Sequence, residues 1–233
     1  MKQFITIFAL AIVTVGCINS YGGINLGANR FFGTQEQDTD QNSALMNPEE
    51  ANEEAPAEFK VKIVTTKGNI VLKVNREWSP NGADRFYNMV KIGYFEDIAI
   101  FRAIEGFMFQ FGIHGDPKVS AEWRKAMIDD DPSVEGVSNQ KGFITFAKSG
   151  DPNSRSVQFF INLGDNGRLD DMGFTPFGQV VEGMEIAEQI NTEYGENKRG
   201  EQGKLQRNGN SYIKGVAPNI DFIKSISLIE DEE

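Results

Sequence analysis

Cysteine and histidine are the scarcest reactive side chains in this chain of 233 residues. Cys17 is the only cysteine and His114 the only histidine. A single cysteine excludes a disulfide within the chain and a metal site built from several thiolates. A single histidine argues against a cluster of imidazole ligands and against a Ser-His-Asp triad. The sequence therefore indicates neither a metal ion nor a cofactor.

Positive charge is also in short supply. The chain has 23 Lys and Arg against 34 Asp and Glu, which gives a net charge of −11. Nucleic acid and anionic membrane surfaces repel such a protein, so neither is expected as its main partner. Hydrophobic residues make up 39% of the chain and include 18 Phe, which is enough for a hydrophobic core. We expect a monomer with one sizeable domain and additional segments.

The N-terminus has the pattern of an export signal. Lys2 precedes an apolar run from Phe4 to Val15 that only two threonines interrupt. Twelve residues are too few to cross a bilayer as a helix, but they match the apolar region of a signal peptide. Residues 1–17 are therefore predicted to direct export, to the periplasm or to an extracytoplasmic membrane surface.

Cys17 directly follows the apolar run. The sequence Thr14-Val15-Gly16-Cys17 resembles a bacterial lipobox, in which the cysteine is acylated and becomes the first residue of the mature protein. Thr14 departs from that motif, which usually has Leu there, and ordinary cleavage nearby with an unmodified cysteine is the alternative. A lipid anchor on Cys17 would be the protein's contact with a membrane, and two acyl signals suffice for stable anchoring.

Residues 18–58 are predicted to be a disordered acidic tether. They contain eight acidic residues and one basic residue. From Thr34 to Glu58 the large apolar side chains are Leu45 and Met46 alone, too few to bury the surface that folding requires. As a flexible coil the tether would span roughly 35 Å.

Residues 59–233 are predicted to form a domain rich in β-strands. Apolar and charged side chains alternate over 59–63, which is the period of a half-buried strand, and a turn at 67–69 leads into a second strand at 70–74. Short apolar runs separated by Gly, Asn and Asp continue this pattern. They lie at residues 98–101, 107–111, 143–147, 158–162, 177–181 and 221–229.

Two helices are expected between the strands. Ser79-Pro80 has the pattern of a helix start, with Ser79 as the N-cap, and Gly93 suits the C-terminal cap. Residues 184–191 place apolar side chains at helical spacing. Many strands with two helices at separate places indicate a mainly-β fold, an antiparallel barrel whose ends the helices close.

An arginine stands within a segment that is otherwise apolar and aromatic, FRAIEGFMFQ at residues 101–110. Taken alone, Arg102 is also consistent with a residue at the rim of a barrel whose charged end stays in water. Two later segments favour another role, FAKSGDPNSRSVQFFIN at 146–162 and LDDMGFTPFGQVVEGMEIAEQI at 169–190. In this order the three segments resemble the signature motifs of the cyclophilin family of peptidyl-prolyl cis/trans isomerases.

The resemblance covers most of the predicted domain, from about residue 59 to 228, because the first hairpin and the first helix also match the family in type and order. It implies a closed eight-stranded antiparallel barrel capped by two α-helices, with an interior packed with side chains. It also implies that the active site is a groove on the outside of the barrel.

Site residues follow from the same resemblance. It implies that Arg102 is catalytic and that proline-containing polypeptides are the partners. The residues that it implies for substrate binding are Phe107, Met108, Gln110, Lys148, Gln158, Phe160, Leu169 and Phe174. Lys148 departs from the usual Asn, but the contact there is made by the backbone. Arg168 stands where some members carry a Trp that contacts the inhibitor cyclosporin, so weak inhibition is expected.

The residue types suit the reaction. An X-Pro bond rotates over a barrier of about 18–20 kcal/mol, because twisting destroys amide resonance. The twisted prolyl nitrogen regains a lone pair, and a donor aimed at it binds the twisted state better than either planar state. The guanidinium of Arg102 offers several N–H groups in one rigid plane. No proton transfer, covalent step or metal is required.

Two other functions stay open at this point. The chain could be a cyclophilin-like module that holds a proline-containing partner with little turnover, or a structural envelope protein. The first shares the whole groove with the enzyme, and the second explains the anchor and tether but not the groove residues. The loop at 113–141 follows no motif, and His114 within it is expected to be a loop residue without a catalytic part.

The first prediction concerns Cys17. We expect cleavage directly before this residue and acylation of its thiol, because it directly follows the apolar run. Mass spectrometry of the mature N-terminus checks both expectations. An unmodified N-terminal peptide that begins elsewhere would contradict lipidation while leaving export in place.

Overall fold

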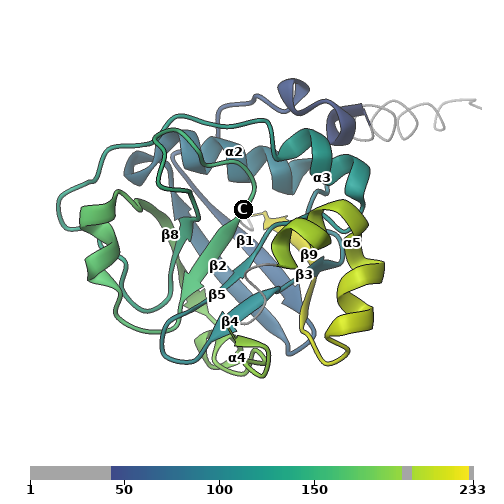
Figure 1. Ribbon diagram of the computed structural model, residues 1–233. Helices are drawn as coiled ribbons and strands as arrows, with labels where there is room; N and C mark the ends of the chain where they lie inside the picture. The colour runs from purple at the N-terminus through teal and green to yellow at the C-terminus, as the bar shows by residue number, and fades with distance from the viewer. Residues whose placement is uncertain (1–42, 196–200, 231–233) are drawn as a thin grey trace, which may run out of the picture.

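One antiparallel sheet organises the protein, whose computed structural model describes residues 43–195 and 201–230 (Figure 1). The predicted signal peptide and the lipidation site at Cys17 lie outside the described residues. The strands of the sheet are β1 (Glu58–Thr65), β2 (Asn69–Asn75), β3 (Ile98–Ala99), β4 (Arg102–Ile104), β5 (Met108–Phe111), β6 (Phe143–Phe146), β7 (Phe159–Asn162), β8 (Pro176–Glu182) and β9 (Phe222–Ile229).

The strand order is β3-β9-β1-β2-β8-β6-β7-β5-β4, and β3 and β4 at its two ends belong to one short stretch of chain. Ala99 in β3 pairs with Phe222 in β9, whereas Arg102 in β4 pairs with Gln110 in β5. The two ends of the sheet therefore lie next to each other, and the sheet curves around its core. The expected mainly-β antiparallel fold is confirmed, and nine strands replace the expected eight because this stretch is divided.

Aromatic rings fill the concave side of the sheet. Phe159 lies at the centre, with ring centroids of Phe146 at 4.3 Å and Phe86 at 5.3 Å. All three side chains are fully buried. Burial of a side chain of this size contributes about 1.5–3 kcal/mol, so these rings are a main source of the stability of the sheet.

More helices lie against the sheet than the two that the sequence predicts. α2 (Pro80–Lys91) ends shortly before Gly93, whose φ of 71° is the left-handed conformation that glycine adopts at helix ends. The helix expected at 184–191 is shorter, since α4 covers Met184–Ala187. The additional elements are α3 (Pro117–Trp123), α5 (Gln202–Val216) and the 3-10 turns η1 (Pro48–Glu50), η2 (Arg76–Trp78) and η3 (Gly167–Met172).

The expectation of two capping helices is wrong chiefly because of α5. Leu205 and Ile213 on this helix are buried in a second, small core with Phe101 and Phe222. Gly209 interrupts the helix with a φ of 64°. A Cβ atom at this position would lie 2.0 Å from the backbone oxygen of Gly115. A glycine that disfavours helix in the sequence is thus required by close packing against the loop before α3.

Part of the segment expected to be a tether at 18–58 is folded onto the domain, because residues 43–58 are packed along α2. The side-chain amide of Asn88 forms two hydrogen bonds with the backbone of Glu53, of 2.7 and 3.0 Å. The carboxylate of Asp84 accepts the N–H of Ala55 at 2.9 Å. Amino-acid composition does not reveal hydrogen bonds to the backbone, so the sequence predicted a disordered segment here. The rest of the expected tether lies outside the described residues.

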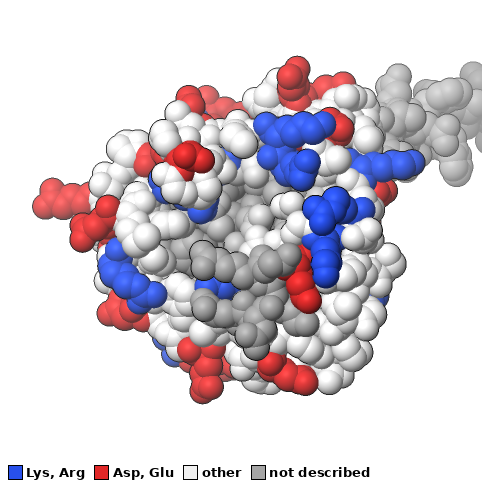
Figure 2. Space-filling model, in the orientation of Figure 1, with Lys and Arg blue, Asp and Glu red and all other residues white. Residues whose placement is uncertain are grey.

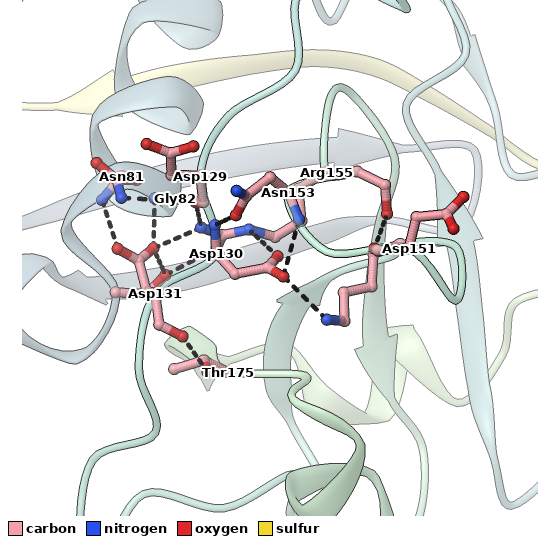
Figure 3. Close-up of polar contacts among 12 residues, drawn as sticks. Asn81, Gly82, Asp129, Asp130, Asp131, Asp151, Asn153, Arg155 and Thr175 are labelled. Carbon is pink, nitrogen blue, oxygen red and sulfur yellow. Dashed lines mark hydrogen bonds and ion pairs between the residues drawn. The ribbon is translucent and has the colours of Figure 1, made fainter.

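The first N–H groups of α2 are satisfied by a distant acid and not by the Ser79 side chain. The Ser79 hydroxyl donates to the carboxylate of Asp131, which also accepts the N–H groups of Asn81 and Gly82 at 3.1 and 3.0 Å (Figure 3). A carboxylate at this position satisfies helix N–H groups that have no partner within the helix and opposes the positive end of the helix dipole. Ser79 is the N-cap residue, as predicted, but its side chain makes no capping hydrogen bond, and the Asp131 carboxylate accepts the helix N–H groups in its place.

Asp131 is also half of a buried ion pair. Its carboxylate lies 2.9 Å from the guanidinium of Arg155, and the two side chains are only 3% and 4% exposed. Arg155 donates further hydrogen bonds to Ser79 and to the backbone oxygen of Asp129. Such a pair is tolerated in the interior because both Asp131 oxygens and both terminal nitrogens of Arg155 have hydrogen-bond partners.

Removal of this carboxylate should destabilise the fold. We expect Asp131→Ala to lower the free energy of unfolding by about 3 kcal/mol, because it leaves a buried guanidinium without its charge partner and uncaps α2. Asp129→Ala is the matched control, since that neighbouring side chain is exposed. Urea denaturation followed by circular dichroism measures both. Equal stability of the two variants would contradict the role given to Asp131.

Within the ranges that the structure describes, no helix combines the length and the hydropathy needed to span a membrane.

Candidate functional site

A groove of about 450 Å³ lies on the convex side of the sheet, away from the main core. Arg102 and all eight residues predicted to bind substrate line it. On the face that carries α5, Figure 2 shows a hollow near the centre, with basic side chains on more than one side of it. The structure thus brings together residues from three motifs that are separated by dozens of positions in the sequence.

Strand alternation divides these residues between groove and core. On β5, Phe109 and Phe111 belong to the main core, so Met108 and Gln110 point to the opposite side of the sheet. On β7, Phe159 is in the core and Phe160 lines the groove. The interpretation of Phe159 as a core residue is confirmed.

The polar part of the groove is a chain of three side chains. Arg102 Nη1 donates to Gln110 Oε1 at 3.2 Å, and Gln110 Nε2 donates to Gln158 Oε1 at 2.8 Å. The register of β4 and β5 places Arg102 directly opposite Gln110, so the sheet itself fixes the first contact. The guanidinium also lies 5.7 Å from the centroid of the Phe107 ring. These contacts hold the guanidinium in the groove.

The apolar part of the groove adjoins this chain. Met108, Phe160 and Leu169 form a small buried cluster separate from the main core, with Phe107 and Phe174 packed against it. The rings of Phe160 and Phe174 meet edge to face, at 6.0 Å between centroids. An apolar pocket beside a fixed guanidinium can hold a small apolar ring while hydrogen-bond donors face the atoms attached to it.

The loop at 113–141, which matches no motif, supports this pocket. The side-chain amide of Asn139 donates to the backbone oxygen of Phe174 at 2.7 Å and to the carboxylate of Asp170 at 2.7 Å. Ser138 donates to the same carboxylate. These contacts tie η3 and the residues after it to the loop, so they fix the wall that Leu169 and Phe174 provide.

Several groove residues are missed by reasoning from the sequence. Ser149, Ser154 and Ser156 line the groove, but serines in a polar loop give no distinguishing signal. Gln202 reaches the groove from α5, a helix that the sequence pattern does not predict. Arg168 is exposed, and its guanidinium lies 4.9 Å from the centroid of the Phe107 ring. The groove lining therefore carries more polar side chains than the residues predicted from the sequence, whereas Arg168, which is predicted to lie near the site, is outside the lining.

His114 lies outside the lining of the groove. Its ring is 5.0 Å from that of Tyr94, and burial lowers the pKa of the imidazole. The part of the chain covered by the structure contains no group of three or more His, Cys, Asp and Glu side chains arranged to hold a metal ion. The hydrogen-bonding side chains described above for the groove are those of Arg102, Gln110 and Gln158.

Comparison with known proteins gives consistent matches. Residues 60–209 match the family model described as "Cyclophilin type peptidyl-prolyl cis-trans isomerase/CLD". Peptidyl-prolyl cis-trans isomerase A of Dickeya dadantii is 34% identical over 142 residues, which are 59% of this chain and 73% of that protein. Peptidyl-prolyl cis-trans isomerase B of Escherichia coli is 29% identical over 133 residues, which are 54% of this chain and 80% of that protein.

Solved structures agree on the fold. A crystal structure of a cyclophilin-type peptidyl-prolyl cis-trans isomerase of Cryptosporidium parvum is similar with a TM-score of 0.56 and 20% sequence identity. The similarity covers 75% of this chain and 99% of that one. A second structure of the same parasite protein, determined in the presence of the dipeptide Ala-Pro, gives a TM-score of 0.54 at 21% identity, with coverage of 74% and 99%.

Proposed function

Because this chain belongs to the family of cyclophilin-type peptidyl-prolyl cis-trans isomerases, we propose that it isomerises X-Pro bonds through hydrogen bonds from Arg102. The observation that carries this proposal is the chain of contacts from Arg102 through Gln110 to Gln158, placed beside the apolar pocket. A donor with fixed orientation and a site for the proline ring are the two requirements of the reaction. The crystal structure of a relative in the presence of Ala-Pro supports the same class of ligand.

In the proposed mechanism the pocket holds the proline ring, while the rest of the peptide rotates about the bond. Phe107, Met108 and Phe160 bury the ring, and Gln110 hydrogen-bonds the substrate backbone. The guanidinium of Arg102 donates to the prolyl nitrogen as its lone pair develops, which stabilises the twisted state more than the planar states. An acceleration from about 10⁻² to 10³ s⁻¹ requires roughly 7 kcal/mol.

The proposed clients are exported proteins, whose folding such an isomerase would assist. This rests on the predicted signal peptide and on Cys17, which we propose as a lipid attachment site at an extracytoplasmic membrane surface. A shorter linker would then join the anchor to the domain than the sequence predicts, since residues 43–58 pack along α2.

The alternative is a module that binds proline-containing partners with little turnover. The presence of Arg102 and its orientation by Gln110 favour the enzyme, because a binding module has no need of a donor aimed at a twisted bond. An isomerisation assay on a proline-containing tetrapeptide separates the two functions.

Loss of the guanidinium should abolish most of the activity. We expect Arg102→Ala to lower kcat/KM at least about 100-fold, roughly 3 kcal/mol, which is the scale for removing a donor to a transition state. Arg102→Lys should restore only part of the activity, because an ammonium lacks the planar arrangement of donors. The same tetrapeptide assay measures both variants.

Arg124→Ala is the matched control, because this exposed arginine lies outside the groove lining and its loss changes the net charge equally. Near-normal turnover by Arg102→Ala, with a melting temperature equal to that of the control, would refute the catalytic role.

Weak inhibition by cyclosporin is expected from Arg168. A strongly hydrated guanidinium resists burial under an apolar ligand, and loss of a buried indole contact costs about 2 kcal/mol, or about 30-fold in affinity. Isomerisation should be less affected, because Arg102 and the proline pocket do not require this residue. Inhibition titrations compare the wild type with Arg168→Trp, which should bind the drug more tightly. Tight inhibition of the wild type would contradict the expectation.

A further inference from the structure

A lysine of the groove lining is paired with an acid that lies outside the lining, Asp130, whose own contacts are drawn in Figure 3. Lys148 lines the groove, and its Nζ lies 3.1 Å from Oδ2 of Asp130. The Lys148 side chain is 13% exposed and that of Asp130 is 24% exposed. Both charges are therefore partly withdrawn from water, where screening of their effect on a bound peptide is weaker than at an open surface.

The Asp130 carboxylate is held in place by contacts on more than one side. Its Oδ2 accepts the N–H of Asn153 at 3.0 Å, and its own N–H donates to Asn153 Oδ1 at 2.8 Å. Its Oδ1 lies 3.4 Å from Nε of Arg155. Burial raises the pKa of Asp130, but the Asn153 N–H and the Lys148 and Arg155 charges lower it by more. The carboxylate is thus ionised at neutral pH.

The positive charge of Lys148 is balanced only if Asp130 is counted. Asp131 is occupied by Arg155 and by the start of α2, as described above. Among the described residues, Asp130 supplies the one carboxylate within 4.0 Å of the Lys148 ammonium. Among residues 43–195 and 201–230, no acidic side chain lines the groove. Without Asp130, the ammonium would face the groove with its charge uncompensated.

We propose that Asp130 is a specificity-determining residue, which neutralises Lys148 and so suppresses a preference of the groove for substrates with acidic residues near the proline. This inference rests on the proposed function, because it concerns the peptides that the same groove accepts. Asp130 does so from outside the groove lining, through its contact with Lys148. The pairing is available to this chain because it has Lys148 where the resemblance leads one to expect Asn.

The test compares peptides that differ only in charge. A set of proline-containing peptides carries Glu or Lys at each of the two positions before and the two positions after the proline. For the wild type, Asp130→Asn and Asp130→Asn/Lys148→Met, the ratio of kcat/KM for the Glu peptide to that for the Lys peptide is measured at each position. The ratio cancels any general loss of activity or of folded protein.

We expect Asp130→Asn to shift this ratio toward the Glu peptide about fivefold at one position or more, which is the upper scale for a single partly exposed charge pair. The double variant should return to the wild-type ratio, because the ammonium responsible is gone. Added salt should reduce the shift. An unchanged ratio in Asp130→Asn, or a shift that persists in the double variant, would overturn the proposal.

A second variant and a second measurement keep the test decisive. Asp130→Ser replaces Asp130→Asn if the amide variant does not fold, as judged by circular dichroism. The dissociation constants of the same peptides, measured by fluorescence titration, give a second ratio that does not depend on turnover. Absence of turnover in the wild type would then count against the proposed enzyme, whereas an unchanged ratio of dissociation constants would count against the role of Asp130.

Discussion

The buried ion pair between Arg155 and Asp131 is the interaction on which the rest of the structure most depends. One carboxylate accepts the N–H groups at the start of α2 and also neutralises an arginine from the groove wall. Two such charges are costly to remove from water, and they persist in the interior because the Asp131 oxygens and the terminal nitrogens of Arg155 are hydrogen-bonded. The first helix, the loop before β6 and the wall of the groove therefore share one anchor, and none of them can shift without disturbing the others.

The two halves of the groove are positioned in different ways. Arg102, Met108, Gln110 and Phe160 project from strands whose other face belongs to the core, so their positions follow from the sheet. The opposite wall consists of loop segments and η3, which have no sheet to position them. The hydrogen bond that Asn139 donates to Phe174 and the one that Asp130 accepts from Asn153 supply the missing constraint. Precise placement of groups on rigid elements is what stabilisation of a transition state requires.

Much of the fold and of the site could be predicted from local patterns. Period-two alternation in β1 and the proline at the start of α2 are properties of neighbouring residues, and the three motifs bring their site residues with them. What could not be predicted depends on contacts between distant residues. The acid that caps α2 lies 50 positions from Asn81, and α5 contains Gly209 because of its packing against another segment. The ordered part of the expected tether is held through its backbone, which composition does not reveal.

The stretch that carries Arg102 supplies both end strands of the sheet, since it pairs with β9 through Ala99 and with β5 through Arg102 itself. A strand at an open edge exposes its amide protons to exchange whenever that edge frays. Here, fraying of either edge leaves the other pairing in place. Release of the whole stretch requires both pairings to open. The Arg102 guanidinium is thus borne by a stretch of chain that two separate strand pairings hold in place, opposite a wall that depends on side-chain hydrogen bonds.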